Sequence, residues 1–93
     1  MERVPSYLVE TYLARSSADE RTTRERRARS AAVELTRAGT PVRFGGALHV
    51  PEDEICFYVF DACSSRDAAL AAQRAGLDPV RVVEAESSRE ENA

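Results

Sequence analysis

The most apolar window of the chain is Glu54-Ile55-Cys56-Phe57-Tyr58-Val59-Phe60-Asp61-Ala62. It mixes β-branched and aromatic residues and has polar residues at both ends. Successive side chains of a strand point to opposite faces of the sheet, and here both alternating sets of positions are apolar. The window therefore predicts a central strand that is covered on both of its faces.

The size and composition of the chain set limits on what it does. Its 93 residues leave room for one small domain, and 43% hydrophobic and 31% charged residues are typical of a globular chain. The net charge of −3 argues against a nucleic-acid-binding protein, although all 13 basic residues are arginines. No apolar run is long enough to span a membrane, and no apolar segment of a signal peptide follows Met1. Two cysteines make no disulfide framework, so we expect a cytoplasmic protein with reduced thiols.

Working outward from the central strand, the hydrophobic pattern predicts one domain over residues 1–86 and a polar, flexible tail over residues 87–93. Strands are predicted where apolar residues alternate, and helices where they recur at every third or fourth position. The predicted strands cover residues 6–14, 42–50, 54–62 and 80–85, and the predicted helices cover residues 17–38 and 64–75. Gly45-Gly46 lies inside the second strand and predicts a β-bulge or a close backbone approach.

Both predicted helices have the same design. Each begins at a serine, Ser17 or Ser64, and each ends before a glycine, Gly39 or Gly76. Each carries a stripe of small apolar residues that we expect to pack against the sheet, namely Ala28, Ala32 and Leu35, and Ala68, Ala72 and Ala75.

The order of these elements is βαββαβ, which is the order of the ferredoxin-like fold. We therefore predict an α+β domain with a four-stranded antiparallel sheet and both helices on one face. The other face of the sheet is left open, and the second apolar set of the central strand needs a cover there. A second copy of the chain is the simplest cover, so the sequence predicts a homodimer.

Few residues are candidates for chemistry. His49, the one histidine, suits a metal ligand or a general base, but a histidine at a strand end is more often structural. Cys56 and Cys63 do not have a zinc-site spacing, and Cys56 also suits a packed core position. A polar floor on the open sheet face is a further hypothesis, with interface or edge positions as the alternative; its residues would be Glu10, Tyr12, Tyr58 and Glu84.

Several segments together resemble a known family: Tyr7-Leu8-Val9-Glu10, Val42-Arg43-Phe44, residues 51–57, and Ala75-Gly76-Leu77 followed by Arg81-Val82-Val83-Glu84. Over most of residues 6–86 the chain is similar to small actinobacterial proteins of formerly unknown function, one branch of which is described as nickel-binding. The resemblance implies a ferredoxin-like dimer in the cytoplasm. Metal-associated members often have a histidine in the second helix, where this chain has alanine, at or near Ala71. The remaining donors for a metal such as nickel would be His49, Glu10 and Cys56.

These observations leave three hypotheses. The first is a non-enzymatic, dimeric protein that binds a metal ion or a small ligand at the open sheet face; no set of residues has a catalytic pattern, so we prefer it. The second is a cofactor-free enzyme resembling the dimeric α+β barrel monooxygenases and isomerases, with Glu10 or His49 as the base and Tyr12 or Tyr58 orienting the substrate. The third is a protein-interaction module without a ligand.

Overall fold

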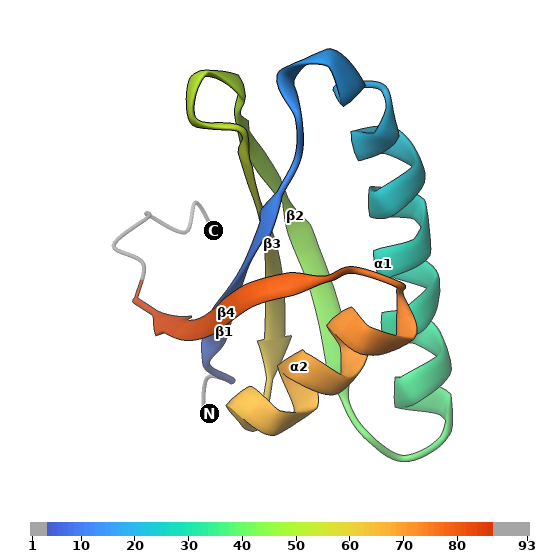
Figure 1. Ribbon diagram of the computed structural model, residues 1–93. Helices are drawn as coiled ribbons and strands as arrows, with labels where there is room; N and C mark the ends of the chain where they lie inside the picture. Colours follow the sequence, from blue (N-terminus) through green and yellow to red (C-terminus); the bar gives the residue numbers. More distant parts are fainter. Residues whose placement is uncertain (1–3, 87–93) are drawn as a thin grey trace, which may run out of the picture.

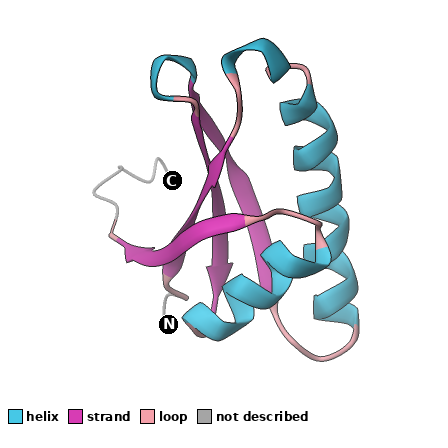
Figure 2. Cartoon of the chain, in the orientation of Figure 1, coloured by secondary structure: helices cyan, strands magenta, loops and turns pink. Residues whose placement is uncertain are grey.

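A computed structural model describes residues 4–86, so the predicted polar tail lies outside the described residues. The chain alternates strands and helices in the predicted order βαββαβ (Figures 1 and 2). The elements are β1 (Ser6–Tyr12), α1 (Glu20–Arg37), β2 (Val42–Val50), β3 (Ile55–Ala62), α2 (Ser65–Arg74) and β4 (Pro79–Ala85). Single turns of 3-10 helix at Arg15–Ser17 and Pro51–Asp53 follow β1 and β2.

The four strands form one antiparallel sheet in the order β2-β3-β1-β4. This order and the two helices confirm the predicted ferredoxin-like α+β fold. The predicted central strand, β3, does lie inside the sheet, between β2 and β1. None of the helices in residues 4–86 is long and apolar enough to cross a membrane.

The core lies between the sheet and the two helices, which share one side of it (Figure 1). β1 and β3 contribute alternate residues to this core, and their fully buried side chains include Val9, Tyr58 and Phe60. The predicted alanine stripes are confirmed, because Ala28, Ala32, Leu35, Ala68, Ala72 and Ala75 are all at most 3% exposed. Their small side chains let the helix backbones approach the sheet closely.

The helix ends were predicted correctly at three of four positions. Ser64 caps α2, because its Oγ accepts a hydrogen bond from the Asp67 N–H at 3.1 Å. Gly39 and Gly76 follow the helices with φ of 104° and 76°, a region that favours glycine. The predicted cap at Ser17 is wrong: α1 begins at Glu20, and no side chain caps it. Ser17 belongs to the preceding 3-10 turn, where its N–H donates to the Ala14 carbonyl at 2.9 Å.

The predicted bulge is present in β2. Phe44 pairs with Phe60, but the next paired residues are Gly46 and Val59, so β2 has one residue more than β3 at this point. The extra residue shifts the alternation of β2 by one position, and every later side chain of the strand changes face. As a result Phe44 and His49, which are five residues apart, both lie on the helix-covered face of the sheet.

No helix covers the opposite face of the sheet, here called the open face. Leu8, Phe57, Val59 and Val83 lie there, paired across β1, β3 and β4, and each is partly exposed. Leu48 joins them from β2 and is 64% exposed. The open face is therefore an apolar surface that the described part of the chain does not cover.

Candidate functional site

The strongest candidate site lies under the helices, where β2 and β3 bring together two side chains of metal-binding type. The register places His49 directly opposite Cys56, and Tyr58 follows two residues further along the same face of β3. Directly opposite residues have Cβ atoms about 5 Å apart, so the imidazole and the thiol are neighbours. Cys56 and Tyr58 are 0% exposed, whereas His49 is half-buried. The chain therefore places a thiol, an imidazole and a phenol on one covered patch of the sheet.

Two polar atoms of this patch have no partner. Among the described residues, His49 Nε2 and Tyr58 Oη are the buried side-chain atoms that lack a hydrogen bond. Leaving a buried polar group unpaired costs about 1–3 kcal/mol, and most native proteins avoid that cost. Unpaired groups of this kind point to a ligand, an ion or a water molecule that would satisfy them.

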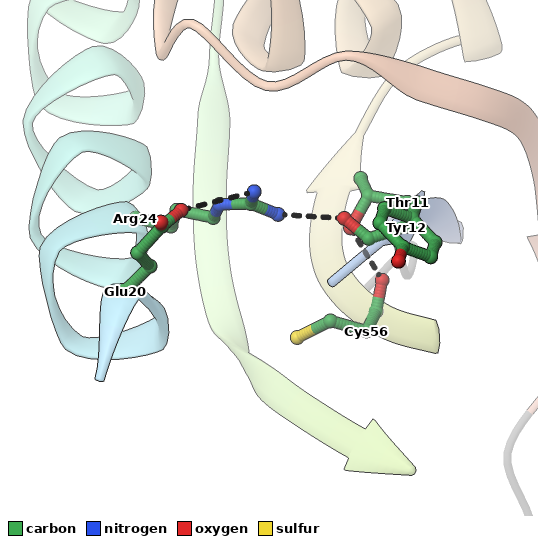
Figure 3. Close-up of polar contacts among 5 residues, drawn as sticks. All are labelled: Thr11, Tyr12, Glu20, Arg24 and Cys56. Atoms are coloured by element: carbon green, nitrogen blue, oxygen red, sulfur yellow. Dashed lines mark hydrogen bonds and ion pairs between the residues drawn. The ribbon is translucent and has the colours of Figure 1, made fainter. Parts of the chain in front are cut away.

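The surrounding backbone is held by two polar side chains (Figure 3). Thr11, which is buried on β1, donates from its Oγ1 to the Cys56 carbonyl at 2.9 Å. Arg24 extends from α1 and donates from Nη1 to the Tyr12 carbonyl at 3.1 Å, while its Nη2 lies 3.4 Å from Glu20 Oε1. The Cys56 sulfur points to the side of the sheet on which α1 lies (Figure 3). The patch is thus built on a fixed frame rather than on a loop.

Burial controls the ionisation of the patch. It raises the pKa of the Cys56 thiol, and the neighbouring Tyr58 hydroxyl and Arg24 guanidinium only partly offset that effect. Burial also raises the pKa of the Tyr58 phenol, and the nearby thiol raises it further. The thiol and the phenol are close enough to influence each other's ionisation, yet no group lies in hydrogen-bonding geometry with Tyr58 Oη. Both groups are therefore protonated at neutral pH.

Glu10 lies away from this patch. It is on the open face, where its Oε1 accepts a hydrogen bond from Arg81 Nε at 3.0 Å and the two side chains form an ion pair. A carboxylate in the middle of a strand needs a compensating partner, and Arg81 of the same chain is that partner. The predicted donors His49, Cys56 and Glu10 therefore do not converge, because the sheet separates the carboxylate from the other two.

The predicted polar floor is also divided between the two faces. Tyr12 is on the open face with Glu10 and is 59% exposed. Tyr58 lies on the helix-covered face, and Glu84 lies opposite Tyr7, whose side chain is part of the core. Side chains of neighbouring strands share a face when the register places them opposite each other, but Glu10 lies opposite Phe57 and Arg81 rather than opposite Tyr58 and Glu84.

The patch fits a metal ion only in part. Thiolate and imidazole are donors that nickel and other late divalent metals accept. Within residues 4–86, however, no group of three or more histidine, cysteine or acidic side chains is arranged to hold a metal. His49 and Cys56 would supply two ligands, and other positions would be filled by water or by a small molecule.

Arg24 and Thr11 are the residues of the site that the sequence did not single out. Arg24 looked like one of many solvated arginines on α1, and its contact with β1 depends on how the helix packs. Thr11 did carry a signal, since it is a polar residue in the same alternating set as Val9 and Leu13, which are buried.

Comparison with known proteins identifies a structural neighbour but no family. No family model and no curated protein matches the sequence. Among solved structures, the chain is similar to SCO4226, a protein of the actinobacterium Streptomyces coelicolor A3(2), with a TM-score of 0.66. The match covers 90% of this chain and 99% of that protein at 15% sequence identity. The comparison supports the fold and a relation in shape to a small actinobacterial protein.

Proposed function

We propose that this chain is a non-enzymatic binding protein that takes a late divalent metal ion, nickel first, at the His49–Cys56 pair. The observation that carries the proposal is the pair of buried, unpartnered atoms, His49 Nε2 and Tyr58 Oη, on residues that neighbour the buried thiol of Cys56. The family resemblance, with its nickel-binding branch, favours nickel over other metals that accept the same donors. This location differs from the open face, where the sequence alone predicts the ligand.

The chemistry of the donors predicts how binding depends on pH. A thiol binds metal as the thiolate, so binding must release the Cys56 proton. Because burial raises the pKa of that thiol, the affinity is expected to increase with pH through the neutral range. Arg24 favours the charged thiolate, and the Tyr58 hydroxyl is a donor for the thiolate or for a bound water molecule.

Calorimetric titration with nickel chloride tests the proposal. Wild-type protein is expected to bind nickel more tightly at about pH 8 than at about pH 7. Cys56→Ser and His49→Gln are each expected to lose more than about tenfold in affinity, since loss of even an indirect partner of a metal costs about 10–100-fold. Circular dichroism would verify that each variant remains folded.

Two variants are matched controls. Cys63→Ser removes the other free cysteine, which is exposed, and Glu10→Gln removes the carboxylate on the open face. Both are expected to bind nickel as the wild type does. Equal nickel binding by wild type and Cys56→Ser, or no binding by the wild type, would contradict the proposal and return the choice to an enzyme or an interaction module.

The ion pair of Glu10 bears on the enzyme alternative. Glu10, one of the two residues predicted as the base, is already paired with Arg81. This pairing favours binding over catalysis.

We also propose that two copies of the chain associate through the open face. The face carries exposed apolar side chains, with Leu48 64% exposed, while the Arg43–Asp61 ion pair lies beyond Val59 and the Glu10–Arg81 pair lies beside Phe57. An exposed apolar surface of this kind marks a protein-interaction site. Sedimentation at micromolar concentration would contradict this proposal if it gave only the 10.3 kDa monomer. A reduced thiol ligand would suit the cytoplasm.

A further inference from the structure

A concave surface lies at the edge of the molecule, between the last turns of α1 and the start of β2. We call it the α1–β2 groove; its volume is about 400 Å³, within the range of small-ligand sites. It is lined by Arg29, Ala32, Val33, Thr36, Arg37, Val42, Arg43 and Phe44. Neither His49 nor Cys56 belongs to it, so the groove is separate from the proposed metal site.

The lining of the groove is sharply divided by chemistry. Its apolar part includes Phe44, which packs against Phe60 with ring centroids 5.5 Å apart, and Val33, which is 44% exposed. Its charged part is Arg29 and Arg37, because the third lining arginine, Arg43, is paired with Asp61 on the open face of the sheet. No acidic residue lines the groove among the described residues. A protein with a net charge of −3 thus places two positive charges at one apolar hollow.

Those two charges have no acidic partner within the described part of the chain. The Arg29 guanidinium lies over the Phe44 ring at 5.4 Å from the centroid, and no ion pair joins Arg29 or Arg37 to an acid in residues 4–86. Another groove beside α1, which is lined by Arg26, Arg27, Ser30, Ala31, Glu34 and Arg74, differs in this respect. Its Arg74 is paired with Glu34 at 3.8 Å.

Hydrogen bonds at Thr36 join the two walls of the groove. The Thr36 hydroxyl donates to the Val42 carbonyl at 2.9 Å and accepts from the Val42 N–H at 3.0 Å. This double contact fixes the last turn of α1 to the first residue of β2. A groove whose walls are fixed in this way needs little rearrangement to bind a ligand.

We propose that the α1–β2 groove binds a small amphipathic carboxylate, a molecule with one anionic group and a short aliphatic or aromatic body. The arginines would pair with the carboxylate, since guanidinium groups match its two oxygens. The apolar body would cover Phe44 and Val33. The modest volume and the fixed walls favour a small molecule over a peptide segment.

The test uses octanoate as the probe, with acetate and octyltrimethylammonium as controls for the apolar body and the charge. Binding would be followed by NMR titration of the full chain. Octanoate is expected to bind at least about tenfold more tightly than either control and to weaken as salt is added. Equal binding of octanoate and octyltrimethylammonium would overturn the proposal, and so would no binding of octanoate.

Variants locate the site. Arg37→Gln is expected to weaken octanoate binding about threefold to fivefold, and Val33→Glu, which adds a negative charge at an exposed helix position, should abolish it. Arg26→Gln is the matched control, because it removes an arginine of the same helix that lines the other groove. A loss of binding in Arg26→Gln equal to that in Arg37→Gln would show a general effect of charge and contradict the assignment. Thermal unfolding of each variant would show that it is folded.

Discussion

Replacing Tyr58 with phenylalanine should make the protein more stable. Its hydroxyl is buried on a side chain that is 0% exposed, and it has no hydrogen-bond partner among the described residues of the folded chain. In the unfolded chain the same hydroxyl is solvated by water, so folding removes that solvation without replacing it. Tyr58→Phe removes that cost and keeps the ring that packs in the core.

The magnitude comes from the cost of an unpaired buried group, about 1–3 kcal/mol. The small void left by the oxygen offsets part of this, so we expect a net gain of about 1 kcal/mol. For a domain of this size that gain corresponds to an increase of about 4–8 °C in the melting temperature.

Urea unfolding followed by circular dichroism at neutral pH measures the change. Tyr12→Phe is the matched control, because its hydroxyl is exposed and makes only a 3.4 Å contact with Glu54. We expect the free energy of unfolding to change by less than about 0.5 kcal/mol in that variant. A loss of more than about 1 kcal/mol in Tyr58→Phe would mean that the hydroxyl has a strong partner, and the case for a ligand at this patch would then fail.

Three further predictions concern stability. Burial raises the pKa of the Cys56 thiol and of the Tyr58 phenol, so both groups ionise first in the unfolded chain, the thiol above about pH 9 and the phenol above about pH 10. Above those values the free energy of unfolding should fall by up to about 1.4 kcal/mol per pH unit for each group, and less steeply in Tyr58→Phe. An unchanged urea midpoint at high pH would refute this prediction. Ala28→Leu should overpack the contact between α1 and the sheet and lower the free energy of unfolding by about 1–3 kcal/mol. A urea midpoint equal to that of the wild type would mean that this contact has free space. Gly46 has φ of 124°, so Gly46→Ala should lower the free energy of unfolding by about 1–3 kcal/mol. The cost comes from backbone strain alone, because a Cβ at this position meets nothing within 4 Å. A melting temperature that matches the wild type would show that the bulge relaxes.

Most of the fold could be predicted from the sequence because its signals are local. Alternation marked the strands, and the alanine stripes marked the buried side of each helix. Gly39 and Gly76 marked the helix ends, since few other residues adopt a positive φ readily. The prediction at Ser17 failed for a local reason as well. Ser17 is part of a 3-10 turn between β1 and α1, and its N–H donates to the Ala14 carbonyl instead of lying at the start of the helix.

The candidate site depends on a detail of strand pairing that composition and periodicity do not reveal. Continued without interruption, the alternation that puts Phe44 on the helix-covered face would put His49 on the open face, near Glu10. The bulge inserts one residue between Phe44 and Gly46, and His49 therefore lies opposite Cys56.

The sequence by itself determined which residues have metal-binding or acid–base chemistry and which elements carry them. Tertiary structure decided which of those residues meet: His49 with Cys56, Glu10 with Arg81, and Arg24 with the end of β1. The physical reason is that the identity of a side chain is local, whereas its neighbours depend on strand register and helix packing, which join residues far apart in the chain.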